Sequence, residues 1–332
     1  MDVLGELNLV GSAPAFLKAV ELIRHFAACD ATVLVQGETG TGKELAARAM
    51  HYLGPRRDYP FLPVNCGAIP DSLVENELFG HARGAFTGAG EARGGMIADA
   101  EKGTLFLDEV EALSHRGQVA LLRFLQDQTY RPLGTGRMVS ANVRVIAASN
   151  VNLERLQARD LFRRDLYFRL NILALEMPPL RIRGGDVRLL AEHFLWQFNL
   201  RYGGREKRLT PETVKWLVAH DWPGNVRELE NVIHRAFLLA EDRTISIDPS
   251  VLAPCIPDAQ RAIQAFDVPG SENLGLAKAR LVAEFEKTFL SRMLAETGGN
   301  VSVAARRCGK ERRTFGKLLK KYGIERTRYL DA

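Results

Sequence analysis

The stretch GETGTGKE at residues 37–44 constrains the fold more than any other part of the sequence. An apolar run at residues 32–37 leads into it, and a helical pattern begins at Glu44. Glycines at a strand-to-helix turn let backbone N–H groups point at phosphate oxygens, and a lysine there adds a positive charge. We therefore predict a phosphate-binding loop made of Gly37, Glu38, Thr39, Gly40, Thr41, Gly42, Lys43 and Glu44.

Two acidic residues, Asp108 and Glu109, follow the apolar run TLFL at residues 104–107. Asp108 is expected to hold Mg²⁺, directly or through water, and Glu109 to orient and deprotonate an attacking water. Glu44 stands where such loops usually carry a Ser or Thr that ligates the metal, so the metal must depend on other groups. The alternative is two solvated acids after a strand, but with the loop upstream the pair predicts a nucleotide hydrolase.

Short apolar runs alternate with helical patterns in the first half of the chain. The runs at residues 32–37, 61–65, 104–109 and 143–149 are typical of buried parallel strands. This alternation, from about residue 20 to 175, predicts an α/β layer sandwich. Together with the phosphate-binding loop it gives a nucleotide-binding domain, which we place at residues 7–184.

The strand signals stop at residue 185, where a small helical domain, residues 185–247, is predicted. Its helices are expected at residues 186–202, 210–220 and 225–240, with Thr210 and Pro211 as N-cap and first helical residue of the second one. Prolines and glycines then mark residues 248–275 as a linker.

The net charge of +5 is concentrated at the C-terminal end. Residues 301–332 carry ten Lys and Arg against three acidic residues, a net of +7, which leaves −2 for the other 300 residues. A local basic block is a common sign of nucleic-acid binding, although a solvated charged helix is the plainer alternative. No apolar run could span a membrane, so no membrane insertion is expected, and the four scattered cysteines indicate reduced thiols in the cytoplasm.

The last part, residues 276–325, is expected to be an all-α domain. An amphipathic pattern covers residues 276–295, and two short helices are predicted near 301–308 and 311–321. Ala305 and Gly309 are four residues apart, which lets two helices cross closely, as in a helix-turn-helix. The second helix would present its first residues to base edges and its later lysines to phosphates. The candidate DNA-binding residues are Arg306, Arg312, Arg313 and Lys317.

The stretch HARGAFTGAG, residues 81–90, sets one large apolar residue among glycines. Gly84 and Gly88 allow a tight turn that no buried helix needs. Phe86 is then an apolar anchor of the kind that dominates protein contacts, and Thr87 can add a hydrogen bond. The alternative is that Phe86 fills a gap in the core. For His81 we favour a packing or surface role over a metal-binding or basic one.

In these motifs the chain resembles the AAA+ bacterial enhancer-binding proteins, which activate RNA polymerase carrying the sigma-54 factor. The resemblance runs from Leu7 to Tyr322, through GETGTGKE (37–44), ELFGHARGAFTGA (77–89), GTLFLDE (103–109), FRRDLYFRL (162–170), PPLRIR (178–183) and WPGNVREL (222–229). It implies an AAA+ P-loop NTPase core with a small helical lid, followed by a Fis-like helix-turn-helix domain, with ATP and Mg²⁺ as cofactors. It also implies a loop inserted into a helix that contacts sigma-54 through Gly84, Ala85, Phe86, Thr87, Gly88 and Ala89.

The resemblance extends to residues around the phosphate site. Asn65 resembles the residue that holds Glu109 away from the water until the γ-phosphate is read, a role that suits a carboxamide. Asn150 resembles the sensor I residue near the γ-phosphate, and Arg227 resembles the sensor II arginine of the lid. A surface ion pair is the alternative for the arginine.

Two more arginines, Arg163 and Arg169, resemble the arginine fingers of the family. Arg164 stands beside Arg163 and leaves that assignment open, and a surface ion pair is again the alternative. If the family geometry holds, each finger completes the site of a neighbouring subunit, so ATPase activity requires a ring, with a hexamer as the expected state.

The implied partners are the sigma-54 RNA polymerase holoenzyme, enhancer DNA and further copies of the chain, which would pair on DNA through residues 276–295. Because the resemblance begins within the first ten residues, we expect no N-terminal regulatory domain. Control is then expected from a separate negative regulator, from expression level or from DNA loading.

The predicted function is a sigma-54-dependent transcriptional activator that uses ATP hydrolysis to remodel the polymerase closed complex. The main alternative is a nucleotide-sensing DNA-binding regulator that does not remodel sigma-54. A chelatase or helicase loader is a third reading, and the helix-turn-helix argues against it.

Overall fold

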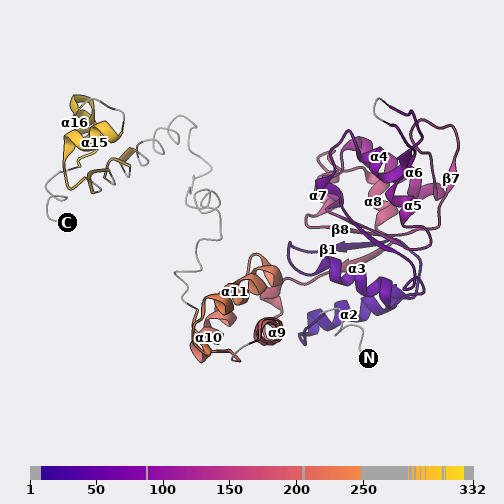
Figure 1. Ribbon diagram of the computed structural model, residues 1–332, viewed down its shortest axis with the longest axis horizontal. Helices are drawn as coiled ribbons and strands as arrows, with labels where there is room; N and C mark the ends of the chain where they lie inside the picture. Colours follow the sequence, from indigo (N-terminus) through magenta and orange to yellow (C-terminus); the bar gives the residue numbers. More distant parts are fainter. Residues whose placement is uncertain are drawn as a thin grey trace. The chain divides into compact units, whose positions relative to one another are not determined.

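The structure is a computed structural model that describes residues 9–86, 89–203 and 206–247, and further on residues 283, 286, 287, 289–291, 293–295, 297–308, 310 and 312–324. The chain divides into two compact units, Met1–Leu252 and Ala253–Ala332 (Figure 1). Several predictions fall outside the described residues: those for Thr87 and Gly88, the linker 248–275, the beginning of the helix 276–295, and Gly309.

The first unit is built on a five-stranded sheet with the order β2-β5-β8-β1-β9, in which all neighbours are parallel. The strands are β1 (Val33–Gln36), β2 (Phe61–Asn65), β5 (Thr104–Asp108), β8 (Arg144–Ser149) and β9 (Leu173–Glu176). The first four confirm the predicted parallel strands. The edge strand β9, in which only Leu175 is buried, is not among the predicted ones.

Residues of each central strand alternate between two apolar cores, one on each face of the sheet. In β1, Val33 and Val35 pack with α2 (Pro14–Ala27) and α3 (Lys43–Tyr52), whereas Leu34 faces the other core. That core is closed by α6 (His115–Asp127) and α8 (Arg164–Leu170). Figure 1 shows the sheet between these two layers. The predicted layer sandwich therefore follows from strands that are buried on both faces.

Short elements connect the layers. They are η1 (Cys66–Ala68), α4 (Val74–Phe79), β3 (Gly80–His81), β4 (Arg93–Gly94), α5 (Met96–Asp99), η2 (Val110–Ala112), β6 (Thr129–Tyr130), β7 (Val139–Ser140), α7 (Leu153–Gln157) and η3 (Leu180–Ile182). The pairs β3–β4 and β6–β7 are two-stranded antiparallel ribbons outside the main sheet.

The helical lid consists of α9 (Asp186–Tyr202), α10 (Pro211–Ala219) and α11 (Asn225–Leu239). Thr210 caps α10, because its side chain accepts a hydrogen bond from Thr213 N at 3.2 Å, as predicted. Trp222 is fully buried at the centre of the lid core, to which Leu180 also belongs. The expectation that strands stop at residue 185 is wrong in detail, since β10 (Arg208–Leu209) and β11 (Thr244–Ile245) form a short parallel pair.

The second unit contains α15 (Val301–Arg307) and α16 (Arg312–Lys321), close to the predicted helices. Asn300 caps α15 by accepting hydrogen bonds from Ser302 N and Val303 N. The helices pack around a small core made of Leu290, Leu294, Ala304, Ala305, Phe315 and Leu319. The small alanine side chains allow the two helices to approach closely. Among all the described residues, no helix is long and apolar enough to cross a membrane.

His51 on α3 is a buried titratable group in the first unit, 1% exposed. Its Nδ1 lies 3.0 Å from Thr104 Oγ1 in β5. Burial lowers the pKa of this imidazole from its ordinary value of 6.5, and the nearby charge of Arg144 acts in the same direction. Protonation of His51 should therefore favour the unfolded chain.

Folding stability should consequently be full above pH 6.5 and decrease below it, because the unfolded chain takes up a proton that the folded chain resists. One such group contributes a slope of at most about 1.4 kcal/mol per pH unit. Urea unfolding at about pH 7.5 and about pH 5.5 measures the difference. His51→Gln retains a hydrogen-bonding group and does not titrate, so it should lose less stability over this interval. An equal loss in both proteins would contradict the prediction.

Candidate nucleotide site and contact loop

The loop from β1 to α3 carries the predicted phosphate-binding residues. Gly40 and Gly42 have φ angles of 80° and 94°, which side chains rarely adopt, so glycine is needed for this path. Lys43 Nζ donates to Gly37 O at 2.7 Å and to Glu38 O at 3.1 Å. Burial lowers the pKa of Lys43, and the negative charge of Asp108 opposes that shift. The predicted loop residues therefore surround an amine whose contacts are backbone carbonyls of the same loop.

The predicted acidic residues lie at the same edge of the sheet. Asp108 ends β5, and Asn150 follows β8, the strand between β5 and β1. Burial raises the pKa of Asp108, while a hydrogen bond from Glu109 N at 3.0 Å and the charge of Lys43 lower it. Glu109 has a left-handed backbone, φ 53°, which is uncommon for a residue with a side chain and is often found at functional sites.

Asn65 and Glu109 approach each other around Gly67. Asn65 Oδ1 accepts from Gly67 N at 2.8 Å and from Ala68 N at 3.2 Å, which caps η1. A Cβ atom added to Gly67 would lie 2.8 Å from Glu109 Oε2 and 3.2 Å from Asn65 Oδ1. The two oxygen atoms therefore flank one Cα atom, and the absence of a side chain there leaves room for the Glu109 carboxylate.

Glu111 belongs to this site although it is not among the predicted residues. Its Oε1 accepts from Asn150 N at 3.2 Å, and its Oε2 is buried with no hydrogen-bond partner in the described part of the chain. Burial and the charge of Glu111 raise the pKa of the neighbouring Cys66 to about 12, so this thiol stays protonated. The only sequence signal for Glu111 is its place two residues after Glu109.

The lid reaches the phosphate loop at the start of α11. Val226 N donates to Gly40 O at 3.0 Å, and a Cβ atom on Gly40 would lie 3.2 Å from Arg227 Cβ. The structure therefore places the Cβ atom of Arg227 beside the loop. Two residues that the prediction did not single out, Arg181 and Asn225, also contact the loop, and both lie in motifs quoted above, PPLRIR and WPGNVREL.

Arg163 and Arg169 are held by contacts away from the phosphate loop. Arg163 makes two hydrogen bonds with Asp165, at 3.0 and 2.6 Å, just before and within α8. Arg169 donates to Leu125 O at 3.0 Å and to Gln126 O at 3.2 Å at the end of α6. Phe168 in the same helix exposes 59% of its surface. Arg169 and Phe168 are exposed and Arg163 is partly exposed, so all three lie at the surface of the unit.

The segment between α4 and α5, residues 80–95, contains the predicted sigma-54-binding residues, and we call it the contact loop. The strands β3 and β4 form its base. Phe86 exposes 46% of its surface, and its ring lies 4.9 Å from the ring of His81, whose Nδ1 is 2.7 Å from Asn76 Oδ1. His81 is thus a packing residue, as expected. Gly84 N donates to Ala89 O at 2.8 Å, which closes the turn below the tip. Phe86 is partly open to solvent and does not fill the core.

A second loop, residues 131–138 between β6 and β7, supports the base of the contact loop. Leu133 N donates to Gly80 O, and Ala82 N donates to Leu133 O, both at 2.9 Å. Gly134 has a φ of 75°, and a Cβ atom there would lie 2.6 Å from Ala85 Cβ. This contact could not be predicted from the sequence, because its hydrogen bonds are made by main-chain atoms.

The candidate DNA-binding residues Arg306, Arg312, Arg313 and Lys317 are all exposed on α15 and α16. Their positive charges therefore face solvent around the small core of the second unit. Such a surface can bind the phosphates and base edges of DNA.

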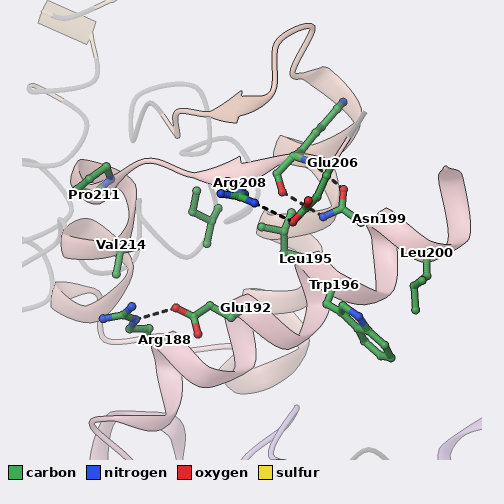
Figure 2. A pocket seen from close by; sticks show the side chains of 12 residues that line it. Arg188, Glu192, Leu195, Trp196, Asn199, Leu200, Glu206, Arg208, Pro211 and Val214 are labelled. Atoms are coloured by element: carbon green, nitrogen blue, oxygen red, sulfur yellow. Dashed lines mark hydrogen bonds and ion pairs between the residues drawn. The ribbon is translucent and has the colours of Figure 1, made fainter. Parts of the chain in front are cut away.

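A separate groove of about 900 Å³ lies on the lid along α9, β10 and α10 (Figure 2). Arg188 and Glu192 pair at 2.7 Å on its wall, and Trp196 and Leu200 expose 58% and 66% of their surface. No predicted nucleotide-site residue lines this groove, so it is distinct from the phosphate site.

The sheet order, the phosphate loop with its acidic strand end, and the attached lid define an AAA+ ATPase. Comparison with known families agrees along the chain. The Sigma-54 interaction domain matches residues 9–176, the AAA+ ATPase lid domain matches residues 181–262, and the Bacterial regulatory protein, Fis family, matches residues 281–322.

Individual relatives match over nearly the full length of this chain. The chain is 41% identical over 317 residues to transcriptional regulatory protein GlrR of Escherichia coli (strain K12), covering 96% of this chain and 68% of that protein. It is 38% identical to nitrogen fixation protein AnfA of Azotobacter vinelandii, covering 96% of this chain and 58% of that protein. The crystal structure of NtrX from Brucella abortus in complex with ADP is similar with a TM-score of 0.72 and 32% identity, covering 96% of this chain and 69% of NtrX.

The chain therefore belongs to the family of sigma-54-dependent transcriptional activators. This confirms the predicted fold class, the ATPase and the Fis-type helix-turn-helix domain. It also confirms the predicted function in transcription activation with sigma-54.

Gly67→Ala tests the arrangement of Asn65 and Glu109. The added methyl group must displace the Glu109 carboxylate, whereas the phosphate loop is untouched. We expect the ATP hydrolysis rate to fall by roughly tenfold, since small displacements of a base are costly, with ATP affinity close to wild type. Phosphate release and equilibrium binding of a fluorescent ATP analogue measure the two quantities.

Gly185→Ala is the matched control, because a Cβ atom there has no neighbour within 4 Å and the backbone is right-handed, with φ −64°. Wild-type hydrolysis by Gly67→Ala would mean that the observed position of the Glu109 carboxylate is not used in catalysis.

Proposed function

We propose that the chain works as an ATP-driven ring that pushes the contact loops against sigma-54 and helps the polymerase open promoter DNA. The observation that carries this proposal is the separation of two surfaces. The groups suited to phosphate chemistry gather at the carboxyl edge of the sheet, whereas Phe86 stands on a braced loop with 46% of its surface exposed. An exposed aromatic side chain on a supported loop is suited to bind a protein partner.

Each polar group of the site has one proposed role in ATP hydrolysis. Lys43 leaves the loop carbonyls and binds the β and γ phosphates, and Glu109 takes a proton from the attacking water. The half-buried Asp108 would hold Mg²⁺ through its carboxylate, and the ion would neutralise phosphate charge there. Asn150 and Arg227 would bind the γ-phosphate. Asn65 would keep the Glu109 carboxylate away from the attacking water until the nucleotide is bound.

Arg163 and Arg169 are proposed to complete the site of the next subunit. Their place at the surface of the unit supports this role, as does the exposed Phe168 beside them, because an apolar surface next to charged groups suits a subunit contact. A hexameric ring built in this way has six shared sites and works in the cytoplasm, where its DNA and polymerase are found.

The exposed cations of α15 and α16 are proposed to bind enhancer DNA, with residues 276–295 pairing two subunits there. The alternative function, a nucleotide sensor that binds DNA without remodelling sigma-54, has no use for a braced loop with an exposed aromatic tip, so we favour the remodeller.

Mixing of inactive subunits tests the shared site. Arg163→Ala and Lys43→Ala should each abolish ATPase activity alone, since an arginine finger contributes ~10³-fold or more to the rate. Mixed rings should regain part of the activity, because some interfaces join an intact phosphate loop to an intact finger. If mixed rings form and stay inactive at every ratio, Arg163 acts within its own subunit.

Phe86→Leu tests the contact loop. We expect ATP hydrolysis and ring formation to remain near wild type, because Phe86 is outside the phosphate site. Open-complex formation at a sigma-54 promoter should fall by roughly thirtyfold or more, the effect of losing ~2 kcal/mol of contact energy.

Tyr59→Leu is the matched control, since Tyr59 exposes 47% of its surface elsewhere on the same unit. It should leave both activities unchanged. A parallel loss of both activities in Phe86→Leu would place Phe86 in the folded core or ring interface, and no loss of either would favour the nucleotide sensor.

A further inference from the structure

The carboxamide of Asn225 is one of the groups that dock the turn at the start of α11 on the phosphate loop. Asn225 is fully buried and has a left-handed backbone with φ 53°. Its Nδ2 donates to Thr39 O at 3.0 Å and to Glu38 Oε2 at 3.2 Å, and its Oδ1 accepts from Leu180 N at 2.8 Å. Asn225 therefore joins the phosphate loop, the segment before the lid and the first turn of α11.

Main-chain atoms fix the same contact. Val226 N donates to Gly40 O at 3.0 Å, and a Cβ atom on Gly40 would clash with Gly224 O. The loop and the start of α11 thus touch with no side chain between them. A displacement of residues 38–40 must either move α11 or break these hydrogen bonds.

Glu38 connects this contact to the lysine of the phosphate site. Its carbonyl oxygen accepts from Lys43 Nζ at 3.1 Å and from Thr41 Oγ1 at 2.8 Å. Its carboxylate accepts two hydrogen bonds from Arg181, at 2.6 and 2.7 Å, which hold the pKa of Glu38 below its ordinary value. Glu38 is therefore bound to Lys43 by its main chain and to Arg181 and Asn225 by its side chain.

We propose that Glu38, Arg181 and Asn225 transmit occupation of the phosphate site to the lid. A charged phosphate oxygen binds an ammonium more strongly than a carbonyl does, so a nucleotide draws Lys43 away from Glu38 O. Residues 38–40 then adjust, and the hydrogen bonds of Asn225 carry the adjustment into α11, where Arg227 is found. The three are positioning residues, and the inference rests on the phosphate site proposed above.

Hydrogen–deuterium exchange of the full chain, with and without ATP, tests this transmission. In the wild type, ATP should protect both the phosphate loop and the first amides of α11. Asn225→Gly keeps a residue suited to the left-handed turn but removes the carboxamide. With loop protection retained, its ATP-dependent protection at the start of α11 should fall by roughly tenfold or more, as expected from the loss of about two hydrogen bonds. A purely structural role would instead change exchange there equally with and without ATP.

Arg181→Ala is a milder variant, because this side chain is exposed and should not be needed for folding. Its matched control is Arg188→Ala, which removes an exposed arginine that pairs with Glu192 at 2.7 Å on α9. Protection of α11 by ATP should fall by about twofold to fivefold in Arg181→Ala, the range for an exposed ion pair, and stay unchanged in Arg188→Ala.

Two outcomes separate the inference from the function on which it rests. If Asn225→Gly and Arg181→Ala keep the wild-type effect of ATP on α11, the transmission is wrong and the phosphate site stands. Lys43→Ala should lose ATP-dependent protection everywhere, and wild-type protection in that variant would overturn the phosphate site itself.

Discussion

The parallel pairing of β1, β8 and β5 is the constraint on which the rest of the first unit depends. Because parallel strands end at one edge, this order brings the phosphate loop, Asn150 and Asp108 together from three distant parts of the sequence. The pairing is stabilised by burial on both faces, as the alternation of Val33, Leu34 and Val35 between the two cores illustrates. The chemistry of the site is therefore held in place by residues that take no part in it.

Local patterns in the sequence were sufficient to predict the main elements. The buried strands, the loop with Lys43 and the cap at Thr210 are each encoded within a few neighbouring residues, so composition and spacing reveal them. Side chains that meet only after folding could not be predicted in this way. Asn225 contacts Thr39 across 186 positions, and Glu111 meets Asn150 across 39, and no spacing rule covers such pairs.

The resemblance to a family supplied roles that geometry within one subunit does not. Arg163 pairs with Asp165, and Arg169 with the end of α6, so neither reveals a catalytic task in its own chain. The same is true of Phe86, which packs against His81 and otherwise faces solvent. The proposed work of these residues is done on another molecule, so it would leave little trace in the contacts within one chain.

The support of the contact loop by residues 131–138 has a consequence for how this sequence can vary. Hydrogen bonds at Gly80, Ala82 and Leu133 involve only main-chain atoms, which every amino acid other than proline can provide. The support therefore places few demands on side-chain identity. Within residues 131–138 Gly134 is the exception, because its backbone angle and its approach to Ala85 exclude a side chain. On the other side of the contact Gly80 is constrained in the same way, since its φ is 72° and a Cβ atom there would clash with Arg93 O. Related chains could differ in sequence across residues 131–138 and still support the loop that carries Phe86, provided that Gly134 is kept.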